Sequence, residues 1–204
     1  MVAFGRWPAS IPKIRSGHAR RFCPDIPGFR LQQRLGEPPA AHGLREPEPG
    51  EFEAERTGFF PSLQMTLNHI YVIDLFYVDA LEGGWLGPKA WENEVPCPTP
   101  AGLEPAQAAV DKRLIAVCDA LTPDLLEGIV RVNRETRVQT ERRDRLLMHL
   151  FQHQIHHRGQ AHAMLSATSV APPQLDEFFA IDEAPLRTAE FDNLGWTEET
   201  VWGA

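Results

Sequence analysis

Apolar side chains recur at helical spacing between Pro61 and Gly84, where the chain reads PSLQMTLNHIYVIDLFYVDALEGG. Pro61 and Ser62 are typical of a helix start, and Gly83 and Gly84 are typical of a helix end. One side of this helix carries mostly apolar positions, namely Leu63, Thr66, Leu67, Ile70, Ile73, Asp74, Tyr77 and Leu81. Because apolar residues cover most of the circumference, the pattern predicts a helix over 61–82 at the centre of a bundle.

A second amphipathic helix is predicted after a connection rich in proline and glycine. The connection spans residues 84–103, and the helical pattern spans 104–121 and stops before Pro123. The apolar side of this helix carries Val110, Leu114, Val117 and Leu121. Both helices therefore present apolar surface that another helix must cover.

The pattern changes after this second helix. Apolar and polar residues alternate around an Asn-Arg-Glu centre, which predicts a short β-hairpin with strands near 128–133 and 136–140. A long helix is predicted over 141–168, and a final short helix is expected near 184–192. The fold class predicted from these elements is an all-α bundle with one short hairpin before its last long helix.

The first 50 residues do not share this organisation. They hold eight of the 18 prolines and show no sustained periodicity. We therefore divide the chain into an irregular N-terminal stretch, residues 1–50, and a helical bundle domain, residues 51–204.

Charge and hydropathy exclude some classes of function. The formal net charge of −8 argues against a nucleic-acid surface, which needs a basic patch. No run of about 18 apolar residues predicts a membrane span, and the N-terminus lacks the apolar core of a signal peptide. We therefore expect a cytoplasmic protein with no nucleic-acid or membrane partner. Its three cysteines show no metal-binding or disulfide pattern.

Histidines are concentrated in the segment Leu146–Leu165, which carries five of the eight in the chain. His149, His153 and His157 follow one another at intervals of four residues, so they share one side of the predicted helix. Two imidazoles at this spacing can bind one metal ion with little strain. We take His153 and His157 as the pair and interpret His149 as a hydrogen-bonded neighbour.

His69 is the best third ligand, because it lies within an apolar helix where an unpaired imidazole would be costly. In an up-down bundle, helix 61–82 can face helix 141–168 and bring His69 to the pair. Three neutral imidazoles suit Zn²⁺, Ni²⁺, Fe²⁺ or Cu²⁺. The alternative from the residues alone is that these histidines are hydrogen-bonded core residues without a metal.

No catalytic residue can be assigned from the pattern. The chain has no GxGxxG, P-loop, GxSxG or HExxH motif, so no organic cofactor site is indicated. Asp74 is interpreted either as support for the metal site or as a buried hydrogen-bonded acid. Arg158 is interpreted either as a partner for a substrate anion or as part of a structural salt bridge. Cys118 is expected in the core.

Two segments resemble the DinB family of bacterial proteins. They are HLFQHQIHHRGQAHAML, followed by PPQLDEFF and EAPLR, and FFPSLQMTLNHIYVIDLFYVDAL, in which His69 follows an asparagine. The resemblance runs from about Glu51 to about Leu194. It implies a four-helix bundle of the DinB/YfiT type, usually a homodimer, that binds one divalent metal ion (Zn, Ni or Fe) through His69, His153 and His157.

The resemblance also implies a range of activities. Relatives include S-transferases and isomerases that use a low-molecular-weight thiol, and proteins described as metal-dependent hydrolases. The expected partners are therefore a small-molecule substrate or a thiol. Many relatives have only a damage-inducible name, which describes expression. The alternative is a non-catalytic metal-binding protein of the stress response.

The chain departs from the family at its N-terminus. The family's first helix carries a pattern such as serine, asparagine, alanine, tryptophan, alanine, asparagine and arginine, which residues 1–50 lack. Codons can be chosen for the stretch from Gln32 to Pro39 so that a shift of one base reads this pattern. Our hypothesis is that residues from about 17 to 48 are a frameshifted translation of the first helix, which this chain would then lack.

Overall fold

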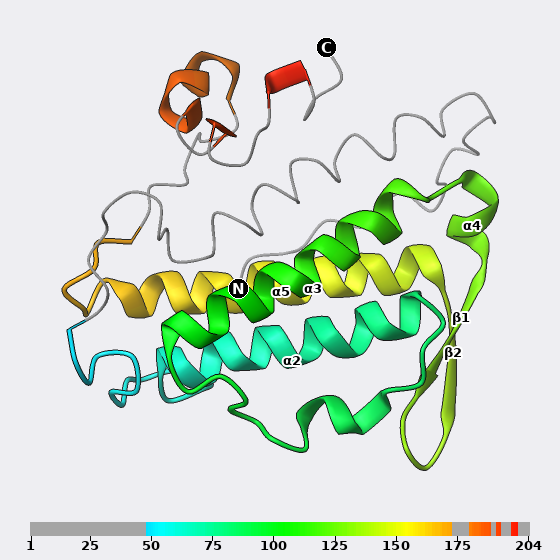
Figure 1. The fold of residues 1–204 in the computed structure, drawn as a ribbon, viewed down its shortest axis with the longest axis horizontal. Helices are drawn as coiled ribbons and strands as arrows, with labels where there is room; N and C mark the ends of the chain where they lie inside the picture. Colours follow the sequence, from blue (N-terminus) through cyan, green and yellow to red (C-terminus); the bar gives the residue numbers. More distant parts are fainter. Residues whose placement is uncertain (1–47, 173–179, 189–190, 193–196, 200–204) are drawn as a thin grey trace, which may run out of the picture.

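The computed structural model describes residues 48–172, 180–188, 191–192 and 197–199. Within them, three long helices form the body of the molecule: α2 (Leu63–Leu81), α3 (Pro100–Asp119) and α5 (Arg143–Leu165). Both α3 and α5 pack along α2, and Figure 1 shows the three helices side by side. The shorter elements are the helix α4 (Pro123–Glu127), the 3-10 helices η3 (Gly87–Trp91) and η4 (Ile181–Arg187), and the strands β1 (Ile129–Asn133) and β2 (Val138–Arg142).

Helix α2 is the central element, as its apolar pattern predicts. Its first turn is capped by Ser62, whose hydroxyl accepts a hydrogen bond from the backbone N–H of Met65. It ends at Leu81 with Glu82 as its C-cap, and Gly83 follows with a φ of 88°, a conformation that favours glycine. Side chains on several sides of α2 are buried, including Ile70, Phe76 and Val78. This burial explains why apolar residues cover most of its circumference.

Helix α3 begins four residues before its predicted start. Thr99 supplies the N-cap through a hydrogen bond from Gly102 N–H to the threonine hydroxyl, and Pro100 occupies the first turn. The prediction placed this Pro- and Gly-rich stretch in the connection, but these residues favour a helix start. The same connection also contains the 3-10 helix η3, which the prediction did not include.

The predicted hairpin is present, with its second strand displaced by about two residues. β1 and β2 are antiparallel, with Ile129 opposite Arg142 and Asn133 opposite Val138. Val130 and Val132 are buried and alternate with exposed positions, which is the pattern from which the hairpin was predicted. Because β2 extends to Arg142, α5 begins at Arg143.

The core of the bundle lies where α2, α3, α5 and the hairpin meet. Its buried side chains include Phe76, Leu114, Val132 and Leu150. Cys118 is also buried there, as expected. The predicted fold class, a helical bundle with a short hairpin, is confirmed. The prediction about a lost first helix concerns residues that the structure does not describe.

The C-terminal part differs in detail from the predicted helix near 184–192. Residues Ile181–Arg187 form a 3-10 helix that contains Pro185. Arg187 is buried and pairs with Glu198 at 2.7 Å between Nε and Oε1.

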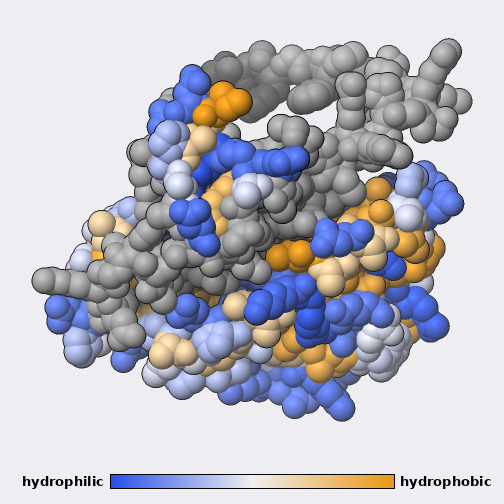
Figure 2. All heavy atoms as spheres, turned by 45° about the horizontal axis from the view of Figure 1, so that its top comes forward, coloured by the Kyte–Doolittle hydropathy of each residue, from blue (hydrophilic) through white to orange (hydrophobic). Residues whose placement is uncertain are grey.

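Figure 2 shows apolar side chains interleaved with hydrophilic ones over the described part of one face. None of the described helices is long and apolar enough to span a membrane.

Candidate metal centre

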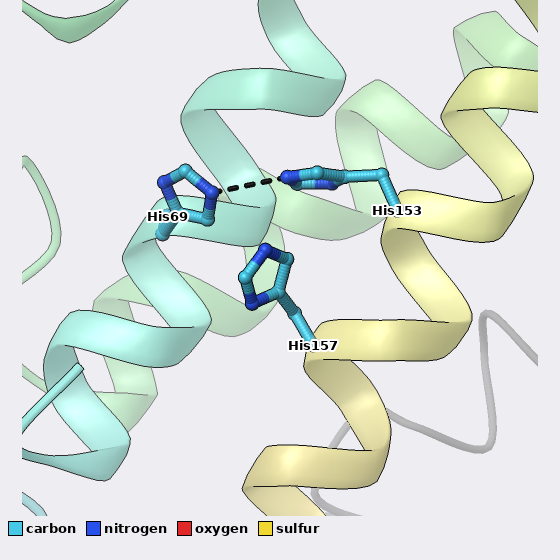
Figure 3. A group of neighbouring side chains, drawn as sticks. All are labelled: His69, His153 and His157. Carbon is cyan, nitrogen blue, oxygen red and sulfur yellow. Dashed lines mark hydrogen bonds between the residues drawn. The ribbon is translucent and has the colours of Figure 1, made fainter. Parts of the chain in front are cut away.

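The three histidines predicted as ligands converge between α2 and α5. His69 projects from α2 towards His153 and His157 on α5 (Figure 3). One ring nitrogen from each residue can be chosen so that all three lie within 4.8 Å of one another. Nε2 of His69 is 3.0 Å from Nε2 of His153. This separation is close to the roughly 3.3 Å between two imidazole nitrogens that share a tetrahedral zinc ion.

Local helix geometry explains half of this arrangement. His153 and His157 are one helical turn apart on α5, and their ring centroids are 4.4 Å apart. The other half depends on packing, because His69 reaches the pair only where α2 lies against α5. The ring centroid of His69 is 5.0 Å from that of His153 and 4.6 Å from that of His157.

The surroundings keep these imidazoles neutral. Burial, together with the charge that His157 would carry, lowers the pKa of His69 to about 4. Burial and the neighbouring histidines lower the pKa of His153 to about 3. Burial also lowers the pKa of His157, although its hydrogen bond with Gln160 acts in the opposite direction. Near pH 7 each ring therefore keeps a lone pair that a metal ion can accept.

Gln160 fixes the tautomer of His157, a role that the sequence analysis missed. Oε1 of Gln160 lies 2.8 Å from Nδ1 of His157. A carboxamide oxygen only accepts hydrogen bonds, so Nδ1 carries the proton and Nε2 keeps its lone pair. The amide of Gln160 also donates to Nε2 of His156 at 3.2 Å. The signal was the spacing of three residues between His157 and Gln160, which places both on one side of α5.

Phe60 covers one side of the cluster and was also missed. Its ring centroid is 4.4 Å from that of His69 and 5.6 Å from that of His157. Nδ1 of His153 is buried and has no hydrogen-bond partner in the described part of the chain. His153 is therefore held through its Nε2, which lies 3.0 Å from Nε2 of His69, whereas His157 is held through its Nδ1 by Gln160. No local pattern around Phe60 indicated this contact, because Phe60 lies outside a regular element.

The remaining histidines of α5 lie outside the group of three. His149 is exposed, and its ring contacts Tyr77 with centroids 5.3 Å apart. Its centroid is 6.4 Å from that of His153. His156 is exposed and bonded to Gln160, and His162 is half-buried. The sequence analysis interpreted His149 as a hydrogen-bonded neighbour one turn from the pair; the structure places it one turn away, where it makes a ring contact with Tyr77.

Asp74 belongs to a separate buried cluster. Nε2 of Gln107 on α3 donates to Oδ2 of Asp74 and to Oδ1 of Asp111, each at 2.9 Å. Burial and the charge of Asp111 raise the pKa of Asp74 to about 7, whereas the charge of Arg158 acts to lower it. Of the two interpretations of Asp74, this geometry favours the buried hydrogen-bonded acid. The positive charge of Arg158 is therefore close enough to Asp74 to lower its pKa, which is an interaction within the protein.

The fold and the site together define a class of protein: a helical bundle in which three neutral histidines from two helices could hold one metal ion. Comparison with known proteins identifies the family. The sequence model of the DinB family matches residues 44–192, which is most of the chain. The protein therefore belongs to the DinB family.

A solved structure has the same fold. The crystal structure of a DinB-like protein from Bacillus cereus ATCC 10987 superposes with a TM-score of 0.56 at 14% sequence identity. The match covers 76% of this chain and 96% of that chain. At this identity the similarity concerns the fold alone. The comparison with curated proteins gave no match.

Proposed function

We propose that this protein is a metal-dependent enzyme of the DinB family that acts as a low-molecular-weight-thiol S-transferase or as a hydrolase. Its metal ligands are His69, His153 and His157. The observation that carries the proposal is the convergence of three neutral imidazoles, with candidate ligand nitrogens within 4.8 Å of one another. Protein sites with three ligands keep a coordination position for water or substrate, whereas closed structural sites use four.

The donor set fits a divalent transition metal. All three donors are imidazole nitrogens, which suit Zn²⁺, Ni²⁺ or Fe²⁺ better than Ca²⁺ or Mg²⁺. The hydrogen bond between Nδ1 of His157 and Gln160 leaves Nε2 free to bind the ion. Among the residues that the structure describes, no carboxylate joins the three histidines in the group. The protein therefore contributes no negative charge from this group to offset that of the cation.

The protein's own residues would set up the chemistry. A bound divalent ion would act as a Lewis acid and lower the pKa of a thiol or water that it coordinates. The rings of His69 and His153 are neutral near pH 7, so one nitrogen of each ring has a lone pair that can bind the ion. Phe60 packs over the rings of His69 and His157 and excludes water from that side. A substrate must then approach from another side.

Turnover measurements with defined metal content test this proposal. Protein reconstituted with Zn²⁺ or Ni²⁺ is assayed for thiol consumption with an electrophilic aryl halide, and for hydrolysis of activated esters. We expect turnover that chelation abolishes and that His153→Ala lacks, while His162→Ala keeps it. A metal-loaded, folded protein without turnover across both panels would favour the alternative, a non-catalytic metal-binding protein of the stress response.

We also propose that the chain forms a homodimer, as the family resemblance implies. Light scattering coupled to size-exclusion chromatography should then give twice the chain mass of 22.9 kDa. A mass of one chain at micromolar concentration would contradict this part of the proposal.

A further inference from the structure

The chain that precedes α2 forms a short closed loop, residues 56–61, beside the candidate metal centre. The backbone N–H of Arg56 donates to the carbonyl of Pro61 at 2.7 Å, which joins the two ends of the loop. Phe60 is half-buried and packs on two of the three histidines, whereas the neighbouring Phe59 is 77% exposed. The loop therefore places one of two adjacent phenylalanines at the histidines and leaves the other in solvent.

Gly58 allows this loop to pack tightly against α5. A Cβ atom at position 58 would lie 2.6 Å from Cε of Met164 on α5 and 2.9 Å from the carbonyl oxygen of Phe60. Both distances are below 3.0 Å, which Cβ atoms in proteins essentially never show. A larger residue would therefore displace the side chain of Met164 and the backbone of Phe60. Glycine at this position keeps the loop, and with it Phe60, close to the helix that carries two of the histidines.

His69 is the histidine whose orientation depends most on Phe60. The ring of His157 is held at Nδ1 by Gln160, but no hydrogen bond from the described residues holds Nδ1 of His69. Nε2 of His69 lies 3.0 Å from Nε2 of His153, and this hydrogen bond cannot persist when both nitrogens bind a metal ion. The ring of Phe60 then restrains His69 from outside the group of three, with centroids 4.4 Å apart and planes at 37°.

From these contacts we propose that Phe60 is a positioning residue that retains the metal: it orients His69 and shields the site from water on the side of His69 and His157. The inference rests on the proposed metal function, and it gives Gly58 the role of holding Phe60 in place. An apolar ring over two of the ligands leaves no room there for an additional water molecule, so the coordination number stays low. The position that binds a substrate then lies away from this loop.

Metal release and the spectrum of the Co²⁺ form test this proposal without an assay of activity. The full chain is loaded with Zn²⁺, and transfer of the ion to an excess of a chromogenic chelator is timed. The Co²⁺ form is measured at saturating metal, because four-coordinate Co²⁺ absorbs visible light more strongly than five- or six-coordinate Co²⁺. The absorption per bound ion therefore reports added water, which a purely structural role of Phe60 would leave unchanged.

We expect Phe60→Ala to release Zn²⁺ roughly tenfold faster than wild type, the lower end of the usual effect of a residue that supports a metal ligand. Its Co²⁺ form should absorb more weakly, because water enters beside His69. Phe60→Leu keeps an apolar side chain without a flat ring and should fall between Phe60→Ala and wild type. Phe59→Ala is the matched control in the same loop and should behave as wild type, because Phe59 is 77% exposed.

Two glycine substitutions test the position of the loop while the ring is kept. Gly58→Ala should release Zn²⁺ faster than wild type, because the new Cβ atom displaces the backbone of Phe60. Gly159→Ala is the matched control on α5, where a Cβ atom meets nothing within 4 Å, and its release rate should equal that of wild type. Together with Phe60→Leu, Gly58→Ala decides the question even if Phe60→Ala does not fold.

Two results would overturn the inference, and they are distinguishable. If wild type binds Zn²⁺ and Co²⁺, and the folded variants at Phe60 and Gly58 match its release rate and its Co²⁺ spectrum, Phe60 only fills space beside α5. The proposed metal function then stands. If folded wild type binds neither ion, the proposed function fails and this inference fails with it.

Discussion

His153 is a residue whose chemistry is set by its surroundings. Free imidazole has a pKa near 6.5, but the ring of His153 is half-buried beside four other histidines. A proton on this ring would place a charge among groups that cannot stabilise it, so the pKa falls to about 3. The same reasoning applies to His69, with a pKa of about 4. Both residues are therefore neutral imidazoles at neutral pH. A metal ion can bind their lone pairs without first displacing a proton.

This protonation state makes a prediction about metal affinity. Three histidines of ordinary pKa would bind metal roughly 50-fold more weakly at pH 6 than at pH 8, because protons compete for the nitrogens. Since the pKa values of His69 and His153 lie far below 6, we expect a change of well under tenfold. Isothermal titration calorimetry with Zn²⁺ at both pH values, corrected for buffer binding, measures it. A fall near 50-fold would show that the histidines titrate normally.

At the scale of elements, the site depends on how α2 meets α5. The spacing of His153 and His157 is local, so the sequence was sufficient to predict that they share one side of a helix. His69 could be added because an imidazole within an apolar helix needs a partner. Gln160 and Phe60 were missed for different reasons. The Gln160 spacing was visible but was not used, whereas the position of Phe60 depends on the path of a loop, for which the chain has no periodic signal.

The contact between α2 and α3 is polar at one point, and sequence reasoning could not resolve it. Asp74 was correctly placed among the inner positions of α2, but its partners Gln107 and Asp111 are on another helix. The start of α3 was predicted four residues too late because its first turn, which begins at Pro100, was assigned to the Pro- and Gly-rich connection. Sequence patterns identify helices and strands well. They identify contacts between side chains on different elements only where a buried polar group, such as His69, would be costly without a partner.

Asp74 gives a prediction at this scale. Its pKa is about 7 in the folded protein against an ordinary value of 3.8, so between these pH values the folded state holds a proton that the unfolded state releases. The free energy of unfolding therefore falls as pH rises from about 4 to 7. Asp74→Asn cannot ionise and lacks this fall. Relative to wild type, its stability should increase by roughly 2–4 kcal/mol between pH 4 and pH 8.

Urea denaturation of metal-free protein at both pH values checks this prediction. The quantity compared is the difference in free energy of unfolding between Asp74→Asn and wild type, measured at pH 4 and again at pH 8. A loss of packing in Asp74→Asn contributes equally at both pH values and cancels. Asp79→Asn is a suitable control on the same helix, because Asp79 is half-buried and lies five residues after Asp74, near the C-terminal end of α2. If Asp74→Asn tracks wild type across the whole range, Asp74 is ionised in the folded protein.

At the scale of the whole molecule, the N-terminal stretch is the open structural question. The family match begins at residue 44, and residues 1–47 lie outside the described part of the structure. We propose that residues from about 17 to 48 are a frameshifted translation of the first helix of the bundle. The physical reason is that a bundle lacking one helix would leave apolar faces of its neighbours uncovered.

The nucleotide sequence of the gene tests this proposal. Read with a shift of one base, the codons for Gln32 to Pro39 should give serine, asparagine, alanine, tryptophan, alanine, asparagine and arginine. A protein translated in that frame should be more stable to urea than this chain. Codons that give an unrelated sequence or a stop in the shifted frame would rule the frameshift out.

The most direct test of the account is the metal content of the purified protein by elemental analysis. Wild type is measured beside His69→Ala, His153→Ala and His157→Ala, with His149→Ala as the matched control one turn away on α5. We predict about one divalent ion per chain in wild type and in His149→Ala, as expected for a single three-histidine site. The three other variants should contain almost none. A folded wild type that contains no metal and takes up neither Zn²⁺ nor Ni²⁺ would contradict the account.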